Sequence, residues 1–199
     1  MIRLLALRHA ATDWNEAGLL QGRAERALSP AGRAAAATWR LPAFADHWQL
    51  LCSPLRRAQQ TAALLGRSAR IEPALIEMAL IEMDWGAWEG LRPADLRRTD
   101  PRFAAEAARG LDLTPPGGES PRQVAARLLP WLAALGEDSV AVTHKGVLRA
   151  LLHLATGWDF QGKAPAKPAA GRAFLFERLD GHLSLVPGLV SLTALAPAP

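Results

Sequence analysis

The sequence predicts an α/β fold, a three-layer α/β/α sandwich with a largely parallel central sheet. Three short apolar runs, typical of buried strands, alternate along the chain with segments that carry helix signals. This alternation is typical of a parallel sheet with helices on both faces. A chain of 199 residues can bury a sizeable core, so we expect a single domain over residues 1–199.

The first strand and helix are expected near the N-terminus. Residues 2–7 are apolar apart from Arg3, which predicts a buried strand. Ser29-Pro30 begins a helix, because serine caps helix N-termini and proline fits the first turn. This helix continues through an alanine-rich stretch to about residue 40. A second buried strand is expected at Leu50-Leu51-Cys52.

The segment after this strand repeats the same helix signal. Ser53-Pro54 predicts a capped helix that continues to about Leu65. Strand-like pieces follow between residues 71 and 84, among them Ala79-Leu80-Ile81. Residues 85–90 are expected to form a turn-rich aromatic loop.

The middle of the chain, about residues 91–116, is rich in arginine and alanine. We expect a helical or irregular insertion there that covers the site. Ser120-Pro121 begins a further helix, whose apolar positions 124, 128, 132 and 135 fall on one face. Pro130 lies within this helix and is expected to kink it.

The last third of the chain completes the sheet. Val140-Ala141-Val142 predicts the third buried strand, and a helix is expected from about residue 146 to residue 155. Apolar residues on both sides of Asp180-Gly181 indicate a closing hairpin. The Ala-Pro tail is expected to fray.

Charge and composition narrow the class of protein. The net charge is +4, but the basic residues are scattered, and the tightest clusters are the pairs Arg56-Arg57 and Arg97-Arg98. A nucleic-acid-binding face usually carries a denser basic stripe, so we expect no nucleic-acid partner and a small anionic substrate instead. A single cysteine, Cys52, excludes a disulfide framework.

No feature of the sequence indicates a membrane. No apolar run approaches the ~18 residues of a membrane span, and the first nine residues lack the cleavage site of a signal peptide. We therefore expect no membrane association and a cytoplasmic location. The sequence leaves open whether the chain forms a homodimer.

Polar groups follow each of the three predicted strands, as Arg8-His9, Cys52-Ser53 and Thr143-His144. Ligands of open α/β sheets bind beyond the carboxyl ends of the strands, so these groups should meet in one place. Helix N-termini nearby attract anions, and Arg57 lies in the first turn of one of these helices. Because one arginine guanidinium can donate two parallel hydrogen bonds to phosphate oxygens, the sequence predicts a pocket for a phosphoryl group.

Motifs spread over the chain match one known family. The matching segments are Arg8-His9 with Thr12 and Asn15, Gln21-Gly22, Leu28 to Gly32, Ser53 to Ala62, Glu82 with Gly86 to Gly90, Pro116 to Ser120, and Val142 to His144. The sequence resembles the histidine phosphatase superfamily, also called the phosphoglycerate mutase-like family, and in particular its phosphatase branch. The resemblance implies a phosphoglycerate mutase-like fold.

The resemblance also implies a metal-independent phosphomonoesterase that uses no cofactor and forms a phosphohistidine on a small phosphorylated metabolite. The catalytic residues implied are His9 as nucleophile, Glu82 as acid and base, and His144. The phosphate-binding residues implied are Arg8, Asn15 and Arg57, and we add Lys145 to them as a further candidate. Neighbouring arginines should keep the His9 imidazole neutral, as a nucleophile requires. Glu82 should be sheltered from water so that it can hold a proton.

This sequence departs from the family pattern at three positions. Ala10 stands in place of the glycine after the first histidine, and Ala11 in place of the signature glutamate. Ala10 is tolerable only where its φ is negative. Lys145 stands in place of the glycine after the second histidine, and its ammonium could bind a second anionic group of the substrate or point to solvent.

Several alternatives stay open at this stage. A mutase that moves a phosphoryl group between positions is one, and a non-catalytic protein that binds a phosphorylated ligand is another. Glu77 and Glu89 are rivals for the role of Glu82. Trp85 and Trp88 either form a wall of the pocket or pack beneath it.

Overall fold

The structure, a computed structural model, describes residues 1–65 and 75–192, and its centre is one β-sheet. The strands are β1 (Ile2–Arg8), β2 (Gln49–Cys52), β3 (Leu75–Ile76), β4 (Ser139–Thr143), β5 (Arg172–Leu179), β6 (His182–Leu185) and β7 (Val190–Ser191). Their order is β3-β2-β4-β1-β5-β6, with β7 paired to β5. Strands β1 to β4 are parallel, and β5 pairs antiparallel with β1, β6 and β7.

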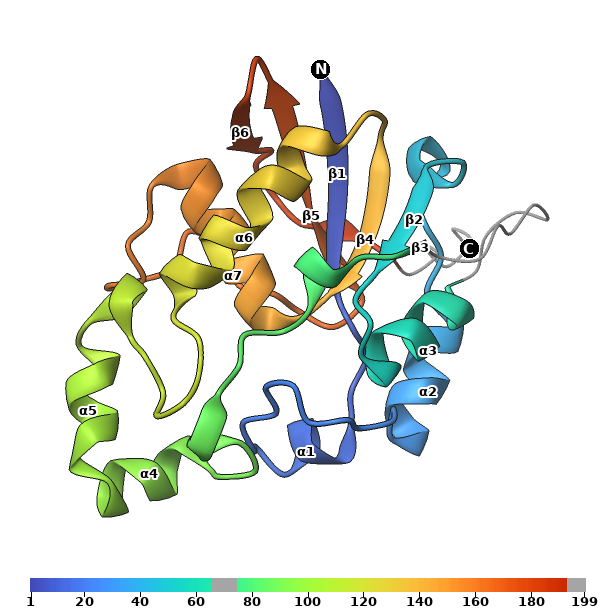
Figure 1. Ribbon diagram of the computed structural model, residues 1–199. Coiled ribbons are helices and arrows are strands. Elements are labelled where there is room, and N and C mark those ends of the chain that lie inside the picture. The colour runs from blue at the N-terminus through green and yellow to red at the C-terminus, as the bar shows by residue number, and fades with distance from the viewer. Residues whose placement is uncertain (66–74, 193–199) are drawn as a thin grey trace.

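Helices cover both faces of the sheet (Figure 1). They are α1 (Asp13–Glu16), α2 (Pro30–Ala37), α3 (Arg56–Leu64), α4 (Pro93–Thr99), α5 (Pro101–Ala107), α6 (Pro121–Ala134) and α7 (Lys145–Thr156). Short 3-10 helices occur at η1 (Ala43–Ala45), η2 (Met78–Leu80), η3 (Gly86–Trp88) and η4 (Gly110–Asp112). The predicted α/β sandwich with a mostly parallel sheet is confirmed.

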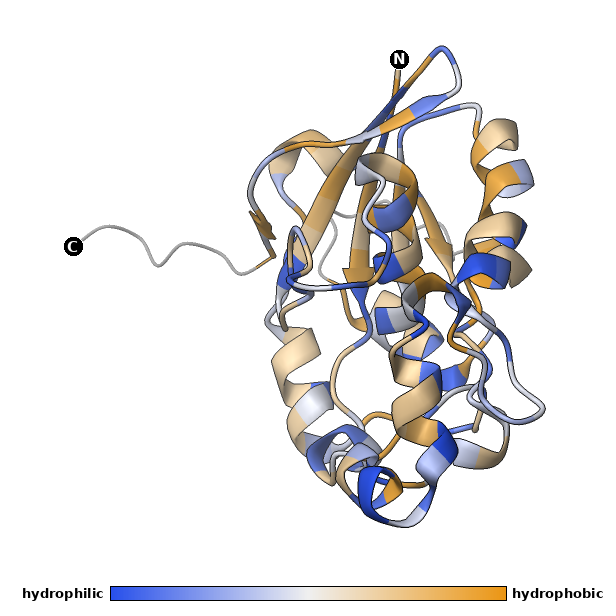
Figure 2. Ribbon diagram, turned by 90° about the vertical axis from the view of Figure 1, so that its left-hand side faces the viewer, coloured by the Kyte–Doolittle hydropathy of each residue, from blue (hydrophilic) through white to orange (hydrophobic). Residues whose placement is uncertain are grey.

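Side chains of β1 alternate between two hydrophobic clusters, one on each face of the sheet. Leu4 and Ala6 pack with residues of α6 and α7, whereas Leu5 and Leu7 pack with residues of α2 and α3. Each buried leucine contributes about 1.5–3 kcal/mol of hydrophobic free energy. Because both faces are covered, the strand is apolar from Leu4 to Leu7, and Figure 2 shows hydrophobic colours along the inner strands.

Two of the three predicted serine caps are present. The Ser29 hydroxyl accepts a hydrogen bond from the Gly32 N–H at the start of α2. Ser120 begins α6 with a capping box that includes Gln123. Helix α6 then continues through Pro130 to Ala134.

The third predicted cap, at Ser53, is wrong. Helix α3 begins at Arg56, and its N-cap residue Leu55 makes no side-chain hydrogen bond to the helix. The hydroxyl of Ser53 instead lies 2.6 Å from Nε2 of His144. The Ser53 side chain, which the local pattern assigns to a helix end, is therefore bound by His144, a residue distant in sequence.

The strand expected at Ala79-Leu80-Ile81 is also absent from the described residues. The chain there forms η2, and the nearest strand is β3 at Leu75–Ile76. The carbonyls of Ala79 and Ile81 accept hydrogen bonds from the guanidinium of Arg127, and the Leu80 carbonyl accepts one from the hydroxyl of Thr143. Because side chains bind these carbonyls, no sheet ladder forms there.

The remaining expectations concern the insertion, the hairpin and the chain end. Residues 93–112 fold into α4, α5 and η4. Strands β5 and β6 form the predicted hairpin, with positive φ at both Asp180 and Gly181 as its two-residue turn requires. The expected strand-like residues 71–74 and the Ala-Pro tail lie outside the described residues.

The helices that the structure describes give no candidate for crossing a lipid bilayer, because each is too short or too polar.

Candidate active site

The three predicted strand ends meet at one edge of the sheet. Strand β4 lies between β1 and β2, and Arg8 pairs in register with Thr143. His9 and His144 therefore lie close together, with their ring centroids 5.0 Å apart. The structure thus brings together polar groups that are separated by more than 130 residues.

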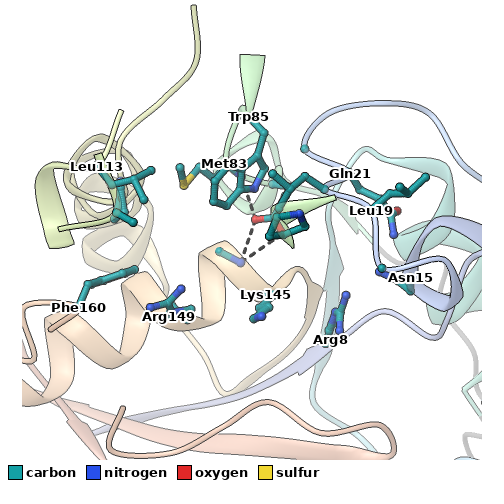
Figure 3. Close-up of a pocket in the computed structure, with 18 of the residues that line it drawn as sticks. Arg8, Asn15, Leu19, Gln21, Met83, Trp85, Leu113, Lys145, Arg149 and Phe160 are labelled. Atoms are coloured by element: carbon teal, nitrogen blue, oxygen red, sulfur yellow. Dashed lines mark hydrogen bonds between the residues drawn. The ribbon is translucent and has the colours of Figure 1, made fainter. Parts of the chain in front are cut away.

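A cavity of about 530 Å³ opens at this edge (Figure 3). Six of the seven predicted site residues line it, namely Arg8, His9, Asn15, Arg57, Glu82 and Lys145. The cavity also has an apolar wall formed by Leu19, Leu20, Met83, Trp85, Phe103, Leu113 and Phe160. The space is larger than a phosphoryl group needs, so it can hold an organic group as well.

His9 has the environment of a neutral nucleophile. The side chain is 6% exposed, and its Nδ1 lies 2.7 Å from the carbonyl oxygen of Ala10. Because a carbonyl only accepts, Nδ1 carries the proton and Nε2 keeps its lone pair. Burial, together with the charges of Arg8 and Arg57, holds the pKa of His9 well below its usual value.

Arg57 is a buried cation without a carboxylate partner among the described residues. It is 1% exposed and donates to the carbonyls of Gly22 and Ala24, at 2.7 and 2.8 Å. Its pKa is lowered by burial. The Nε atoms of Arg57 and Arg8 are buried and have no hydrogen-bond partner within residues 1–65 and 75–192. Unsatisfied buried donors of this kind are costly, and an oxyanion would satisfy them.

Glu82 is held against the N-terminus of α7. It is 8% exposed, and its Oε1 accepts hydrogen bonds from the backbone N–H groups of Met83 at 2.8 Å and Gly146 at 3.0 Å. A Cβ atom at position 146 would lie 2.4 Å from Oε1, so this approach requires glycine. Its rivals Glu77 and Glu89 do not line the cavity.

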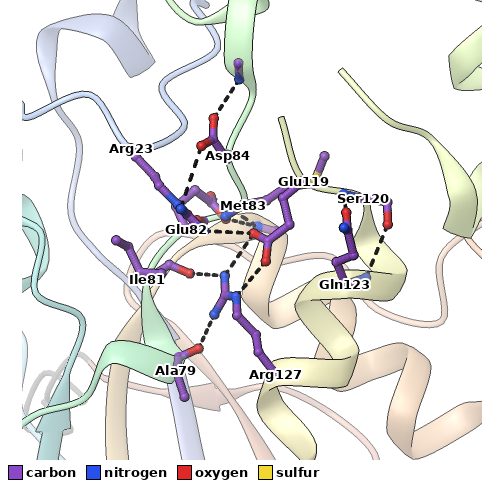
Figure 4. Close-up of polar contacts among 12 residues, drawn as sticks. Arg23, Ala79, Ile81, Glu82, Met83, Asp84, Glu119, Ser120, Gln123 and Arg127 are labelled. Carbon is purple, nitrogen blue, oxygen red and sulfur yellow. Dashed lines mark hydrogen bonds and ion pairs between the residues drawn. The ribbon is translucent and has the colours of Figure 1, made fainter. Parts of the chain in front are cut away.

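A network of charged side chains supports the segment that carries Glu82 (Figure 4). Arg127 donates to two carbonyls of this segment and forms an ion pair with Glu119 at 2.9 Å. Glu119 also pairs with Arg23, whose Nε lies 3.4 Å from the Glu82 carbonyl. Glu119 lies in a motif that the sequence shows, whereas no local pattern in the sequence marks Arg23 or Arg127.

His144 lies deeper than expected. Its side chain is 0% exposed and is not part of the cavity lining. Burial, with the neighbouring His9 and Arg57, holds its pKa well below the usual value. Its Nδ1 atom is buried without a hydrogen-bond partner among the residues that the structure describes. The ring thus lies directly behind the residues that line the cavity, with its centroid 5.0 Å from that of His9.

Asn15 is positioned by a short helix that the sequence analysis missed. Thr12 caps α1, and the Oδ1 atom of Asn15 accepts from the Thr12 N–H at 3.2 Å. The carbonyl half of the Asn15 amide is therefore engaged, and the NH2 half is the donor available to a ligand. This reciprocal capping could have been recognised from Thr12 and the residue three positions later.

The departure at Ala10 is accommodated by the backbone. Among the described residues other than glycine, only Phe160 and Asp180 have positive φ. Ala10 is buried in a hydrophobic cluster, and its N–H donates to the Thr61 hydroxyl at 3.0 Å. A glycine is therefore not required at this position.

The two tryptophans of the aromatic loop have different roles. Trp85 lines the cavity. Trp88 is buried, and its ring meets that of Phe103 edge to face, with the two centroids 5.0 Å apart. Its Nε1 donates to a carboxylate oxygen of Asp100 at 3.2 Å. Trp85 thus forms part of the pocket wall, whereas Trp88 anchors the inserted helices.

No three histidine, cysteine, aspartate or glutamate side chains gather into a potential metal site within residues 1–65 and 75–192.

An imidazole kept neutral between arginines, at the carboxyl edge of a parallel sheet, defines a class of α/β proteins that handle phosphoryl groups. The chain belongs to the histidine phosphatase superfamily (branch 1), whose family model matches residues 4–172. This match confirms the resemblance found in the sequence.

Known proteins with similar sequences include both phosphatases and mutases. A bifunctional protein of Mycobacterium tuberculosis is 33% identical over 146 residues, which are 72% of this chain. The match covers only 38% of the length of that protein. A 2,3-bisphosphoglycerate-dependent phosphoglycerate mutase of Methylobacterium is 35% identical, over 79% of this chain and 82% of that protein. A glucosyl-3-phosphoglycerate phosphatase of Mycobacterium tuberculosis is 32% identical, over 75% and 73%.

Among solved structures, a protein of Escherichia coli assigned provisionally as an alpha-ribazole-5′-phosphate phosphatase has a similar fold. The TM-score is 0.74 at 26% identity, and the alignment covers 97% of this chain and 96% of that one.

Proposed function

We propose that the protein is a phosphomonoesterase that hydrolyses a small phosphorylated metabolite through a phosphohistidine at His9. The observation that carries the proposal is the state of the His9 ring. Its Nδ1 is hydrogen-bonded to a carbonyl, its pKa is held low, and it lies in a cavity with two arginines that have no carboxylate partner in the described part of the chain. This arrangement suits a nitrogen nucleophile that meets a phosphate.

In the first step, the lone pair of His9 Nε2 forms a bond to phosphorus while the bond from phosphorus to the ester oxygen breaks. Glu82 gives its proton to the leaving oxygen, which departs as an alcohol. Arg8 and Arg57 donate to the phosphoryl oxygens, on which negative charge is spread in the transition state. Asn15 supplies a further donor through its NH2 group.

In the second step, water attacks phosphorus, and the bond from Nε2 to phosphorus breaks. Glu82 accepts a proton from the water, so inorganic phosphate leaves and His9 returns to the neutral form. We assign His144 to the buried side of the phosphoryl group, with Nδ1 as a donor. Arg8 and Arg57 supply the positive charge throughout, and the neutral His144 supplies a hydrogen bond, so the mechanism calls for no metal or cofactor.

A mutase is the second candidate, because a relative that is 35% identical carries that name. Mutases must keep water from the phosphohistidine while the substrate reorients. The insertion over this site consists of two short helices and η4, without a long covering segment among the described residues. We therefore favour hydrolysis. A purely binding protein is disfavoured because His9 and Glu82 are both present at the cavity.

Rapid quenching with a radiolabelled phosphomonoester tests the proposal. We expect a phosphoenzyme that is labile in acid and stable in base, as a phosphoramidate is, and that is absent from a His9→Ala variant. Release of inorganic phosphate in step with substrate loss supports a phosphatase. An isomerised product without phosphate release would identify a mutase, and ligand binding without any label would identify a binding protein.

A further inference from the structure

Three basic side chains lie in a row along one side of the cavity. Figure 3 shows Arg8 nearest the strand end, then Lys145, then Arg149, with Phe160 beyond. Lys145 and Arg149 are one helical turn apart on α7, a rise of about 6 Å along the helix axis. The row therefore leads away from His9 along the length of the cavity.

Arg149 is held in place by aromatic rings. Its guanidinium lies 5.0 Å from the ring centre of Trp158 and 4.6 Å from that of Phe160. These two rings are stacked, with centroids 4.6 Å apart and an angle of 10° between their planes. Cation–π contacts orient the guanidinium without neutralising its charge. In the described part of the chain, Arg149 has no carboxylate partner in an ion pair.

The cavity carries far more positive than negative charge. Among the described residues, five basic side chains line it, namely Arg8, Arg57, Arg97, Lys145 and Arg149, and Glu82 is the single carboxylate. A phosphoryl group near neutral pH carries about −1.5 to −2 and is matched by Arg8 and Arg57 alone. Arg97, Lys145 and Arg149 are therefore in excess of what the phosphoryl group needs, and of these three Lys145 and Arg149 lie one turn apart on α7.

Crowding of these cations supports the same conclusion. Burial lowers the pKa of both Lys145 and Arg149, and the pKa of Lys145 is lowered further by the charges of Arg149 and Arg8. A second anion between Lys145 and Arg149 would relieve this repulsion, as opposite charge favours the protonated forms.

We propose that Lys145 and Arg149 form a subsite for a second oxyanion of the substrate, an inference that rests on the proposed function. This oxyanion would lie on the leaving group, at the end remote from the phosphoryl group. The apolar wall, including Met83, Trp85 and Leu113, would pack against the body of the leaving group. The favoured substrate is then a phosphomonoester with an apolar body of about the size of a ring and an anionic group at its far end.

A matched pair of substrates tests this subsite. Phenyl phosphates that carry a carboxylate or an uncharged carboxamide, at the 3- or 4-position, differ mainly in charge. We expect wild-type kcat/KM to favour the carboxylate by about tenfold or more, as a charge-assisted hydrogen bond does. Arg149→Met and Lys145→Met should each reduce this ratio severalfold, and their double variant should bring it near one.

The control is Arg33→Met, which removes an exposed arginine of α2 that does not line the cavity. It should keep the wild-type ratio, so that a general change in net charge is excluded. The ratio of two substrates on one protein is insensitive to the fraction of folded variant. A wild-type ratio near one at both positions, or an unchanged ratio in the double variant, would overturn the proposal.

Binding of the corresponding benzylphosphonates, measured by calorimetry, separates this inference from the proposed function. These phosphonates cannot be hydrolysed, so their relative affinities report the subsite whether or not the protein turns over. Selective binding of the carboxylate without phosphate release would support the subsite and overturn the phosphatase. Phosphate release without selective binding of the carboxylate would support the phosphatase and overturn the subsite.

Discussion

The Nε2 atom of His144 lies 2.6 Å from the hydroxyl oxygen of Ser53, deep behind the cavity. The Leu55 N–H donates to the same hydroxyl at 3.3 Å. The hydroxyl therefore accepts from Leu55 and can give its own proton to Nε2, which leaves the proton of the neutral ring on Nδ1. Ser53 would in this way set the tautomer in which His144 donates toward a phosphoryl oxygen.

Replacement of Ser53 by alanine should therefore affect both stability and activity. Because Nε2 of a fully buried ring loses its partner, we expect a loss of about 1–3 kcal/mol in the free energy of unfolding. We expect kcat/KM to fall about tenfold as the tautomer preference is lost. Denaturant unfolding and steady-state kinetics measure the two effects. Ser184→Ala, at an exposed position of β6, is the control, and equal behaviour of the two variants would contradict the assignment.

Gly146→Ala should displace the Glu82 carboxylate. The added Cβ would lie 2.4 Å from Oε1, and the end of the glutamate side chain must move away. We expect a fall of about a hundredfold in kcat, the scale of a lost general acid. The loss should be smaller with p-nitrophenyl phosphate, whose leaving group needs no proton, than with an alkyl phosphate.

Gly136→Ala provides the matched control for this variant. A Cβ at position 136 would meet no atom within 4 Å, so we expect wild-type kinetics with both substrates. Equal losses with the aryl and alkyl phosphates in Gly146→Ala would argue that Glu82 is not the acid.

Arg127→Met should loosen the segment that carries Glu82. This guanidinium donates to the carbonyls of Ala79 and Ile81 while it pairs with Glu119. We expect a loss of about 1.5–3 kcal/mol in unfolding free energy, the scale of hydrogen bonds that involve a charged group, and a fall in kcat with little change in KM.

Arg122→Met is the control on the same helix. Arg122 is 61% exposed and pairs with Asp112 at the surface, so its loss should change stability by less than about 1 kcal/mol. If KM rather than kcat changes in Arg127→Met, the network acts on substrate binding and not on the position of Glu82.

The central part of the fold and of the site could be predicted because the signals are local and strong. The strand before His9 is apolar because both of its faces are covered, and polar residues at the strand ends necessarily meet at one edge of a parallel sheet. The sterics of an alanine side chain set the condition that φ at Ala10 be negative, and the backbone meets this condition. These features depend on the period and direction of strands, which the sequence carries directly.

What the sequence could not show depends on partners distant in the chain. Ser53 has the same local pattern as Ser29, whose hydroxyl accepts from an N–H within its helix. The Ser53 hydroxyl instead contacts His144 and the N–H of the residue just before α3. Arg127 and Arg149 look like solvated surface residues of helices until their carbonyl and aromatic partners are placed beside them. Side-chain charges of this kind acquire a role only through tertiary contacts.

The pH dependence of stability should report the two buried histidines. Both His9 and His144 have a pKa well below the usual value, mainly through burial. The unfolded chain then binds more protons than the folded chain as the pH falls through about 6.5, the ordinary pKa of histidine. Stability should be full above this pH and decrease below it, down to the folded pKa values.

Each histidine should contribute a slope of about 1.4 kcal/mol per pH unit below about pH 6. We expect His9→Asn to reduce the slope of unfolding free energy against pH by about that amount, because one of the two protonations is removed. Denaturant titrations between pH 7 and pH 5 measure this difference. Replacing the exposed His182 by asparagine should leave the slope unchanged. A wild-type slope retained in His9→Asn would mean that the pKa of His9 is the same in the folded and the unfolded chain, so that its surroundings do not hold the ring neutral as the proposed nucleophile requires.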